Sequence, residues 1–126
     1  MAFVITPLLI LLTACGGSST KVNNLGADAF ASDIKNPGVV VLDVRTAGEF
    51  AAGHIENAIN IDVEAADFDA KISQLDKSVE YAVYCHSGRR SGIATEKMAK
   101  AGFTKISNLN GGIQAWQAAS YPLVNS

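Results

Sequence analysis

The chain has 126 residues, a length that predicts a single domain. Hydrophobic residues make up 48% of it and charged residues 17%, which provides enough apolar material for a core and too little charge for a disordered chain. The net charge is −2, from ten basic and twelve acidic residues, and no basic block or stripe could follow a nucleic-acid backbone. We therefore exclude nucleic acid as a partner.

An uncharged apolar run opens the sequence. Residues 1–14, MAFVITPLLILLTA, are fewer than the roughly 20 that a membrane-spanning helix needs, but they suit the hydrophobic region of a secretory signal. Residues 12–15, LTAC, resemble the lipobox of bacterial lipoproteins, in which the chain before the Cys is removed and the Cys is acylated. The sequence departs from a usual signal because no Lys or Arg precedes the apolar run.

This resemblance implies three parts of the chain. Residues 1–14 are expected to be a cleaved signal, residues 15–20 a flexible tether rich in Gly and Ser, and residues 21–126 a folded domain. Cys15 would carry the lipid and hold an exported protein on a bacterial membrane, at its periplasmic or extracellular face. A plain N-terminal anchor and an ordinary cleaved signal are the alternatives. If Cys15 is acylated, Cys85 is the remaining thiol.

Helical and strand patterns alternate over the first half of the domain. Ala27, Phe30 and Ile34 recur at helical spacing, and 39–42 (VVVL) is a β-branched run typical of a strand buried on both faces. Thr46 and Glu49 fit a capping box, which predicts a short helix. Residues 58–61 predict a second strand. One face of a further helix is marked by apolar residues at helical spacing: Phe68, Ile72 and Leu75.

The second half continues the alternation. Residues 81–84 predict a buried strand that ends at Cys85, and Ser91 can cap the helix that follows, with Gly102 as its end. Residues 106–109 predict another strand, and 111–112 (GG) open a last helix. This pattern is typical of an α/β fold with a mainly parallel sheet and helices on both faces.

Cys85 begins the sequence CHSGRRS, which lies between the predicted strand and helix. Ligands of open α/β sheets bind beyond the carboxyl ends of the strands, which is where this thiol is expected. Successive backbone N–H groups of residues 86–91 can form an anion nest, and Gly88 permits its tight curvature. Arg89 and Arg90 add positive charge, so the loop favours the nucleophilic thiolate.

Two simpler interpretations compete with a reactive thiol. A free Cys at a strand end is often a small buried apolar residue, and paired arginines are usually solvated. Their joint position between a buried strand and a helix favours a functional site. A phosphatase loop, C-x5-R, would place Arg at position 91, which is Ser. The arginines follow Cys85 by four and five positions, so the loop is one residue too short for that class.

Five separated segments then point to one family. The chain resembles the single-domain rhodaneses, or thiosulfate sulfurtransferases, over about residues 21–121. The matching segments are, in order, LDVR at 42–45, EF at 49–50, GHI at 53–55 with AIN at 58–60, CHSGRRS at 85–91, and NGG at 110–112 with Trp116.

The resemblance implies a rhodanese-like five-stranded sheet and a sulfur-transfer cycle without a cofactor. Cys85 would take sulfur from thiosulfate or a persulfide donor and pass it to cyanide or a thiol. His86, Ser87, Gly88, Arg89 and Arg90 would surround the persulfide and the anion. A sulfur carrier or redox relay, and a non-catalytic binding module, are the alternative functions. We expect a monomer.

Several other residues receive structural interpretations. Asp43 and Arg45 are expected to form an ion pair that fixes the loop, His54 to be a hydrogen-bonded structural residue, and Trp116 to lie in the core. Four acidic residues superficially resemble a metal cluster, but their spacing lacks the Gly and the terminal Glu of a calcium loop: Asp62, Glu64, Asp67 and Asp69. The zinc-ligand spacings are also absent, so no metal is expected.

Overall fold

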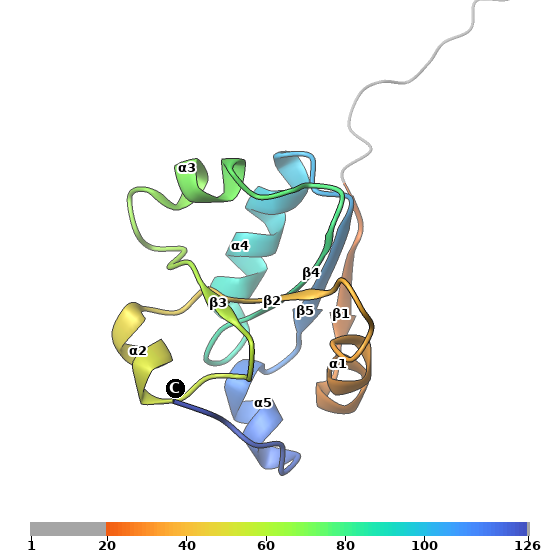
Figure 1. Ribbon diagram of the computed structural model, residues 1–126, viewed down its shortest axis with the longest axis vertical. Helices are drawn as coiled ribbons and strands as arrows, with labels where there is room; N and C mark the ends of the chain where they lie inside the picture. The colour runs from red at the N-terminus through yellow and green to blue at the C-terminus, as the bar shows by residue number, and fades with distance from the viewer. Residues whose placement is uncertain (1–19, 126) are drawn as a thin grey trace, which may run out of the picture.

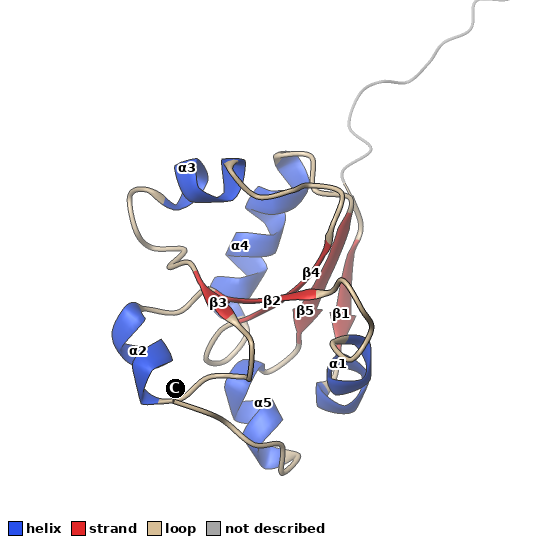
Figure 2. Ribbon diagram, in the orientation of Figure 1, coloured by secondary structure: helices blue, strands red, loops and turns tan. Residues whose placement is uncertain are grey.

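Alternating strands and helices produce one parallel sheet with helices on both sides. A computed structural model describes residues 20–125 (Figure 1). The strands are β1 (Val22–Leu25), β2 (Val40–Asp43), β3 (Ile59–Asn60), β4 (Glu80–Tyr84) and β5 (Lys105–Leu109). The helices are α1 (Ala27–Asp33), α2 (Ala47–Ala52), α3 (Phe68–Ser73), α4 (Arg89–Lys100) and α5 (Gly112–Ala118). The strand order is β1-β5-β4-β2-β3, and each neighbouring pair is parallel (Figure 2).

The predicted order of elements is confirmed, with two differences. The predictions included no strand before residue 27, yet Val22–Leu25 forms the edge strand β1 beside β5. Its two adjacent exposed asparagines, Asn23 and Asn24, leave no continuous apolar run, so its pairing depends on the neighbouring strand. The prediction that Ser91 caps α4 is wrong, because the N-cap is Gly88, three residues earlier, and the helix begins at Arg89.

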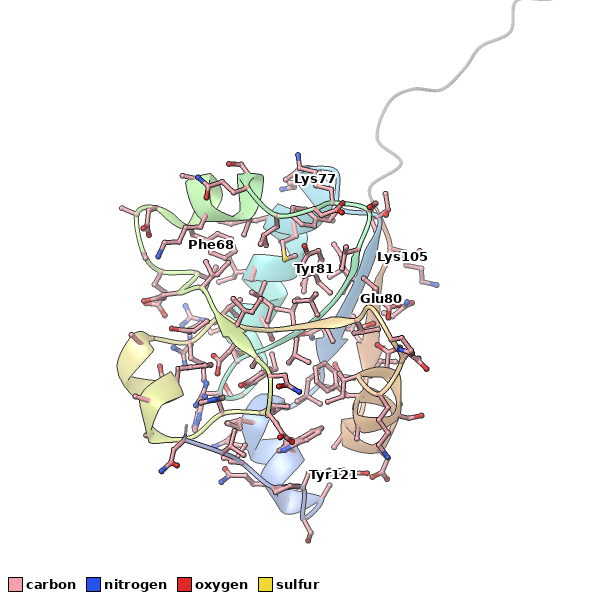
Figure 3. The ribbon with its side chains drawn as sticks, in the orientation of Figure 1. Phe68, Lys77, Glu80, Tyr81, Lys105 and Tyr121 are labelled. Atoms are coloured by element: carbon pink, nitrogen blue, oxygen red, sulfur yellow. The ribbon has the colours of Figure 1, made fainter. Side chains whose placement is uncertain are left out.

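Successive side chains along the strands point to opposite faces of the sheet, so a separate hydrophobic core forms on each face. On one face, residues such as Leu42, Val83 and Ile106 pack beneath α3 and α4. Tyr81 (Figure 3) belongs to this core and meets Phe103 edge-on, with ring centroids 5.4 Å apart.

On the other face, Val41, Ala82 and Tyr84 pack against α1 and α5. Phe30 of α1 meets Trp116 of α5 there, with ring centroids 6.1 Å apart and planes at 84°. Trp116 is therefore a core residue, as the sequence predicted. The sheet is thus covered by two helices on each face, and α2 lies beyond the end of β2.

Because the strands are parallel, their beginnings lie at one edge of the sheet and their ends at the other. Glu80 and Lys105 pair at the starts of β4 and β5 and mark the amino edge (Figure 3). Cys85 follows the last residue of β4 and so lies at the opposite, carboxyl edge. The α2 segment and the start of α5 lie at the same edge (Figure 1). The predicted reactive loop is therefore at the end of the fold where such sheets bind ligands.

Within residues 20–125, no helix combines the length and the apolar character needed to cross a membrane. The predicted signal, Cys15 and most of the predicted tether lie outside the described residues, so the division of the chain at residues 14 and 20 stays a prediction.

Candidate active site

Cys85 directly follows β4, and its side chain turns toward the core beneath α4. The residue is only 1% exposed. Its Sγ atom accepts a hydrogen bond from the backbone N–H of Gly88 at 3.0 Å and lies 3.3 Å from the Ser91 hydroxyl oxygen. The thiol is therefore held by polar contacts from its own loop, unlike a cysteine that serves only as a small apolar core residue.

The start of α5 fixes the loop that surrounds this thiol. The N–H of Ile113 donates to the carbonyl oxygen of Cys85 at 2.8 Å, and the N–H of Gln114 donates to that of His86 at 3.2 Å. In a trans peptide the carbonyl and the following N–H point in opposite directions. The N–H groups of His86 and Ser87 therefore point away from α5. This orientation leaves them available to a ligand on the side of the loop opposite α5.

Gly112 makes this close approach possible. A Cβ atom added there would lie 2.5 Å from the His86 oxygen and 2.6 Å from the Cys85 oxygen, and the residue has a left-handed φ of +60°. Both features require glycine. The sequence identified 111–112 only as a helix start, and its Gly-Gly pair was the signal that two backbones meet.

Gly88 begins α4 in a left-handed conformation, with φ of 108°. Ser91 consequently lies inside the first turn of the helix and is fully buried. Its hydroxyl donates to the carbonyl oxygen of Gly88 at 3.2 Å in addition to its contact with Cys85. A residue predicted as a helix cap is thus a direct neighbour of the thiol.

The two arginines of the loop have different surroundings. Arg90 donates two hydrogen bonds to the Glu49 carboxylate, at 2.6 and 2.8 Å, and lies 3.9 Å from a Glu64 carboxylate oxygen. The hydrogen bonds to Glu49 raise the pKa of Arg90, and the same pair lowers the pKa of Glu49 to about 2. Arg89 is exposed and forms no ion pair with the described part of the chain.

Glu49 links α2 to the thiol loop, a role that the sequence analysis missed. It completes the predicted capping box with Thr46, whose hydroxyl accepts a hydrogen bond from the Glu49 N–H at 3.2 Å. The same carboxylate holds Arg90, which follows 41 residues later. No local pattern can indicate a contact across that separation.

Asp43 and Arg45 form the predicted ion pair. Their closest atoms are 2.7 Å apart and both side chains are buried. Arg45 also donates to the Gly53 carbonyl at 2.7 Å, so the pair joins the end of β2 to the turn after α2. Burial favours a lower pKa for Arg45, but the hydrogen bonds and charge of Asp43 outweigh burial and the pKa is raised. The hydrogen bonds of the Cys85 sulfur are with Ser91 and Gly88 and with neither of these two residues, which is consistent with a supporting role.

His54 is a hydrogen-bonded structural residue, as the sequence predicted. Its Nδ1 atom lies 2.7 Å from the Phe50 carbonyl oxygen, and its ring stacks on the Phe50 ring with centroids 3.7 Å apart. His86 and Ser87, by contrast, are exposed at the mouth of the loop. His86 lines a small cleft of about 180 Å³ with residues of α2 and α5, among them Glu49 and Ile113.

The four acidic residues at 62–69 do not converge on one point. Asp62 accepts a hydrogen bond from the Glu64 N–H at 2.8 Å, and Asp67 pairs with Lys71 at 3.3 Å. Glu64 lies near Arg90, and Asp69 near Lys97. Among residues 20–125, no group of three or more potential ligand side chains could hold a metal ion.

The contact of Gly112 with the loop predicts a large effect of a single methyl group. Gly112→Ala should lower the free energy of unfolding by about 2 kcal/mol or more, from backbone strain at positive φ together with the collision with two carbonyls. Gly92→Ala is the matched control, since its Cβ would meet no atom within 4 Å and Ala favours the helix. Urea denaturation measures both; equal stabilities would contradict the proposed contact.

The Glu49–Arg90 pair predicts acid sensitivity. The pKa of Glu49 is about 2 in the folded protein, below its ordinary value of 4.5, so the pair stabilises the fold above about pH 4.5 and this contribution is lost as the pH falls toward 2. Glu49→Gln should therefore lose less stability than wild type across this range, measured by urea denaturation at several pH values. The exposed Glu56→Gln should follow wild type. An unchanged acid dependence in Glu49→Gln would rule out the pair as a source.

Comparison with known proteins identifies the family. A model of the rhodanese-like domain matches residues 26–119. The thiosulfate sulfurtransferase GlpE of Pseudomonas fluorescens is 34% identical over 93 residues, which cover 73% of this chain and 82% of that protein. A sulfurtransferase of Allochromatium vinosum is 29% identical over 104 residues, 82% of this chain and 95% of that protein.

The fold comparison agrees. The crystal structure of a rhodanese-related protein from Thermoplasma volcanium has a TM-score of 0.73 and 35% sequence identity, and the match covers 82% of this chain and 99% of that one. The predicted rhodanese-like sheet, with five parallel strands and helices on both faces, is confirmed. The chain belongs to the rhodanese-like domain family, with relatives that are named sulfurtransferases.

Proposed function

We propose that this protein is a sulfurtransferase that moves sulfane sulfur through a persulfide on Cys85. The donor is thiosulfate or a persulfide, and the acceptor is cyanide or a thiol. One observation carries the proposal: the loop that holds Cys85 turns two of its carbonyls toward α5, and the Gly88 N–H donates a hydrogen bond to the Cys85 sulfur. The Pseudomonas fluorescens relative is named a thiosulfate sulfurtransferase, which supports thiosulfate as the donor.

In the first half of the cycle, the Cys85 thiolate attacks the outer sulfur of thiosulfate. A new sulfur–sulfur bond forms to Sγ, the bond between the outer sulfur and the sulfite sulfur breaks, and sulfite leaves with the bonding electron pair. The enzyme is left with a persulfide that carries the negative charge on its outer sulfur. The N–H groups of the loop are suited to that charge, because backbone donors that point at a common centre bind anions.

In the second half, an acceptor attacks the outer sulfur. Cyanide gives thiocyanate, and a thiolate gives a new persulfide; in each case the sulfur–sulfur bond breaks and Cys85 leaves as the thiolate. Two successive displacements balance without an oxidant or reductant, so the proposed cycle needs no cofactor.

The loop arginines have separate roles in this proposal. Arg89 is exposed beside the mouth of the loop and attracts the anionic donor. Arg90 is held by Glu49 and keeps its positive charge beside the thiol loop, where it also attracts the anionic donor. His86, Ser87 and Gly88 contribute the main-chain donors around the sulfur. Asp43 and Arg45 fix the neighbouring segments.

We further propose that the protein is a monomeric lipoprotein held on a bacterial membrane through Cys15, at its periplasmic or extracellular face. The support is the sequence alone: the uncharged apolar run of residues 1–14, the LTAC segment at 12–15, and the Gly- and Ser-rich residues that follow.

The first test of the sulfur-transfer proposal measures intact mass. Incubation with thiosulfate should leave the protein one sulfur atom heavier, and peptide mapping should place that atom on Cys85. Cyanide should then remove it with release of thiocyanate. Cys85→Ser should remain at its original mass and lose sulfur-transfer activity. A wild-type protein that gains no sulfur, together with an active Cys85→Ser, would refute the proposal; loading without discharge to cyanide would favour a sulfur carrier.

The lipid-anchor proposal has its own test. Radiolabelled palmitate should enter the protein expressed in a bacterium, and the labelled protein should sediment with membranes. Cys15→Ala should abolish the label, whereas Cys85→Ser should retain it. Label that persists in Cys15→Ala would contradict acylation at this residue.

A further inference from the structure

Ser91 is a polar residue whose position near the thiol needs a physical reason. It lies in the first turn of α4, is fully buried, and is surrounded by the core beneath the helix. A buried hydroxyl is costly unless it has hydrogen-bond partners. Its two partners are the Gly88 carbonyl oxygen and the sulfur of Cys85.

The hydrogen bonds form a short directed chain while the thiol is protonated. The S–H group of Cys85 donates to Ser91 Oγ at 3.3 Å, and the Ser91 hydroxyl donates to the Gly88 oxygen at 3.2 Å. The Gly88 N–H donates to the sulfur at 3.0 Å. In this arrangement the serine oxygen is the acceptor and the thiol is the donor.

Loss of the thiol proton removes the donor between sulfur and serine. A thiolate only accepts hydrogen bonds, so two electron-rich atoms would face each other across 3.3 Å unless the serine hydroxyl rotates toward the sulfur. The rotation leaves no group without a partner, because the Gly88 oxygen also accepts a hydrogen bond from the Gly92 N–H at 3.1 Å. The Gly88 carbonyl therefore keeps a hydrogen bond from the helix backbone after the Ser91 hydroxyl has turned to the sulfur.

We propose that Ser91 reverses its hydrogen bond when Cys85 loses its proton and thereby stabilises the thiolate that takes up and releases sulfur. The inference rests on the proposed function in taking Cys85 as the reacting thiol. The thiolate is the nucleophile when sulfur is loaded and the leaving group when sulfur is discharged. In the persulfide the charge lies on the outer sulfur, and the hydroxyl returns to the Gly88 carbonyl.

Other charged groups face the same region and must be separated from this effect. Arg90 of α4 lies close enough to interact electrostatically with Cys85, and it is held by Glu49 of α2 and Glu64 of the segment before α3. His86 belongs to the loop itself. The α5 helix, which holds the loop carbonyls, carries no titratable side chain in its sequence GIQAWQA.

The test follows the rate at which iodoacetamide alkylates Cys85 in the full chain as the pH is varied. Peptide mass analysis separates Cys85 from Cys15. Ser91→Ala should move the profile to higher pH and slow alkylation about tenfold on its rising part, the effect expected for one hydrogen bond to a charged group. The limiting rate at high pH should not fall, because a thiolate of higher pKa is at least as nucleophilic, whereas a merely disturbed loop would alter the rate at every pH.

Two controls make the result specific. Thr95→Val removes a buried hydroxyl one turn later in the same helix, which bonds to the Ser91 carbonyl and not to the sulfur, and should leave the profile in place. The effect of Ser91→Ala should also persist in a His86→Gln background. If Ser91→Ala does not fold, the variants Ser91→Thr and Ser91→Val replace it in the test. These two side chains have the same shape and differ only in that Thr has a hydroxyl where Val has a methyl group. Only the Thr variant should keep the wild-type profile.

An unchanged profile in Ser91→Ala, or identical profiles in the Thr and Val variants, would overturn the inference. The measurement needs no sulfur transfer. A shifted profile in a protein that takes no sulfur from thiosulfate would therefore support this role of Ser91 while refuting the proposed function.

Discussion

The conformation of the thiol loop depends on two main-chain hydrogen bonds from the start of α5 to the carbonyls of Cys85 and His86. These bonds turn the carbonyls outward, and the planarity of the peptide then turns the following N–H groups inward. Gly112 lies against the two carbonyls. The same contact therefore determines how closely α5 approaches the loop and in which direction the peptide groups of the loop point. A second segment of the chain thus builds the environment of the sulfur without supplying a side chain to it.

Charge around the loop is fixed by partners from distant parts of the sequence. Glu49 holds Arg90 from α2, and the buried Asp43–Arg45 pair ties the end of β2 to the turn that follows α2. A buried ion pair is weak evidence for net stability, but removing one partner leaves an unpaired charge in the interior. Such pairs are suited to holding the loops that they join in fixed positions. Arg89, in contrast, extends to solvent.

Local patterns predicted the elements well where burial and periodicity agree. The apolar runs before Asp43 and Cys85 identified the two central strands, and the Thr46–Glu49 spacing identified the start of α2. The edge strand β1 was missed because its exposed asparagines hide the apolar pattern, and its pairing with β5 comes from tertiary structure.

The thiol and its loop were also predicted from sequence, since they occupy consecutive positions. The contacts that orient them were not. Ser91 was interpreted as a cap because hydroxyls favour helix starts, but Gly88, with its positive φ, starts the helix earlier and places Ser91 under the thiol. The Glu49–Arg90 pair joins residues far apart in the chain, and one sequence contains no signal for such a contact. The Gly-Gly pair at 111–112 indicates a close backbone approach, but it does not indicate which loop is approached.

We propose that the loop presents its N–H groups to a sulfur carried by Cys85. A crystal structure of the protein after reaction with thiosulfate would show this arrangement. We expect one additional sulfur bonded to Cys85 Sγ, within hydrogen-bond distance of N–H groups of residues 86–90, with the carbonyls of Cys85 and His86 still bonded to α5. A modified Cys85 whose outer sulfur meets carbonyl oxygens, or a loop detached from α5, would contradict it.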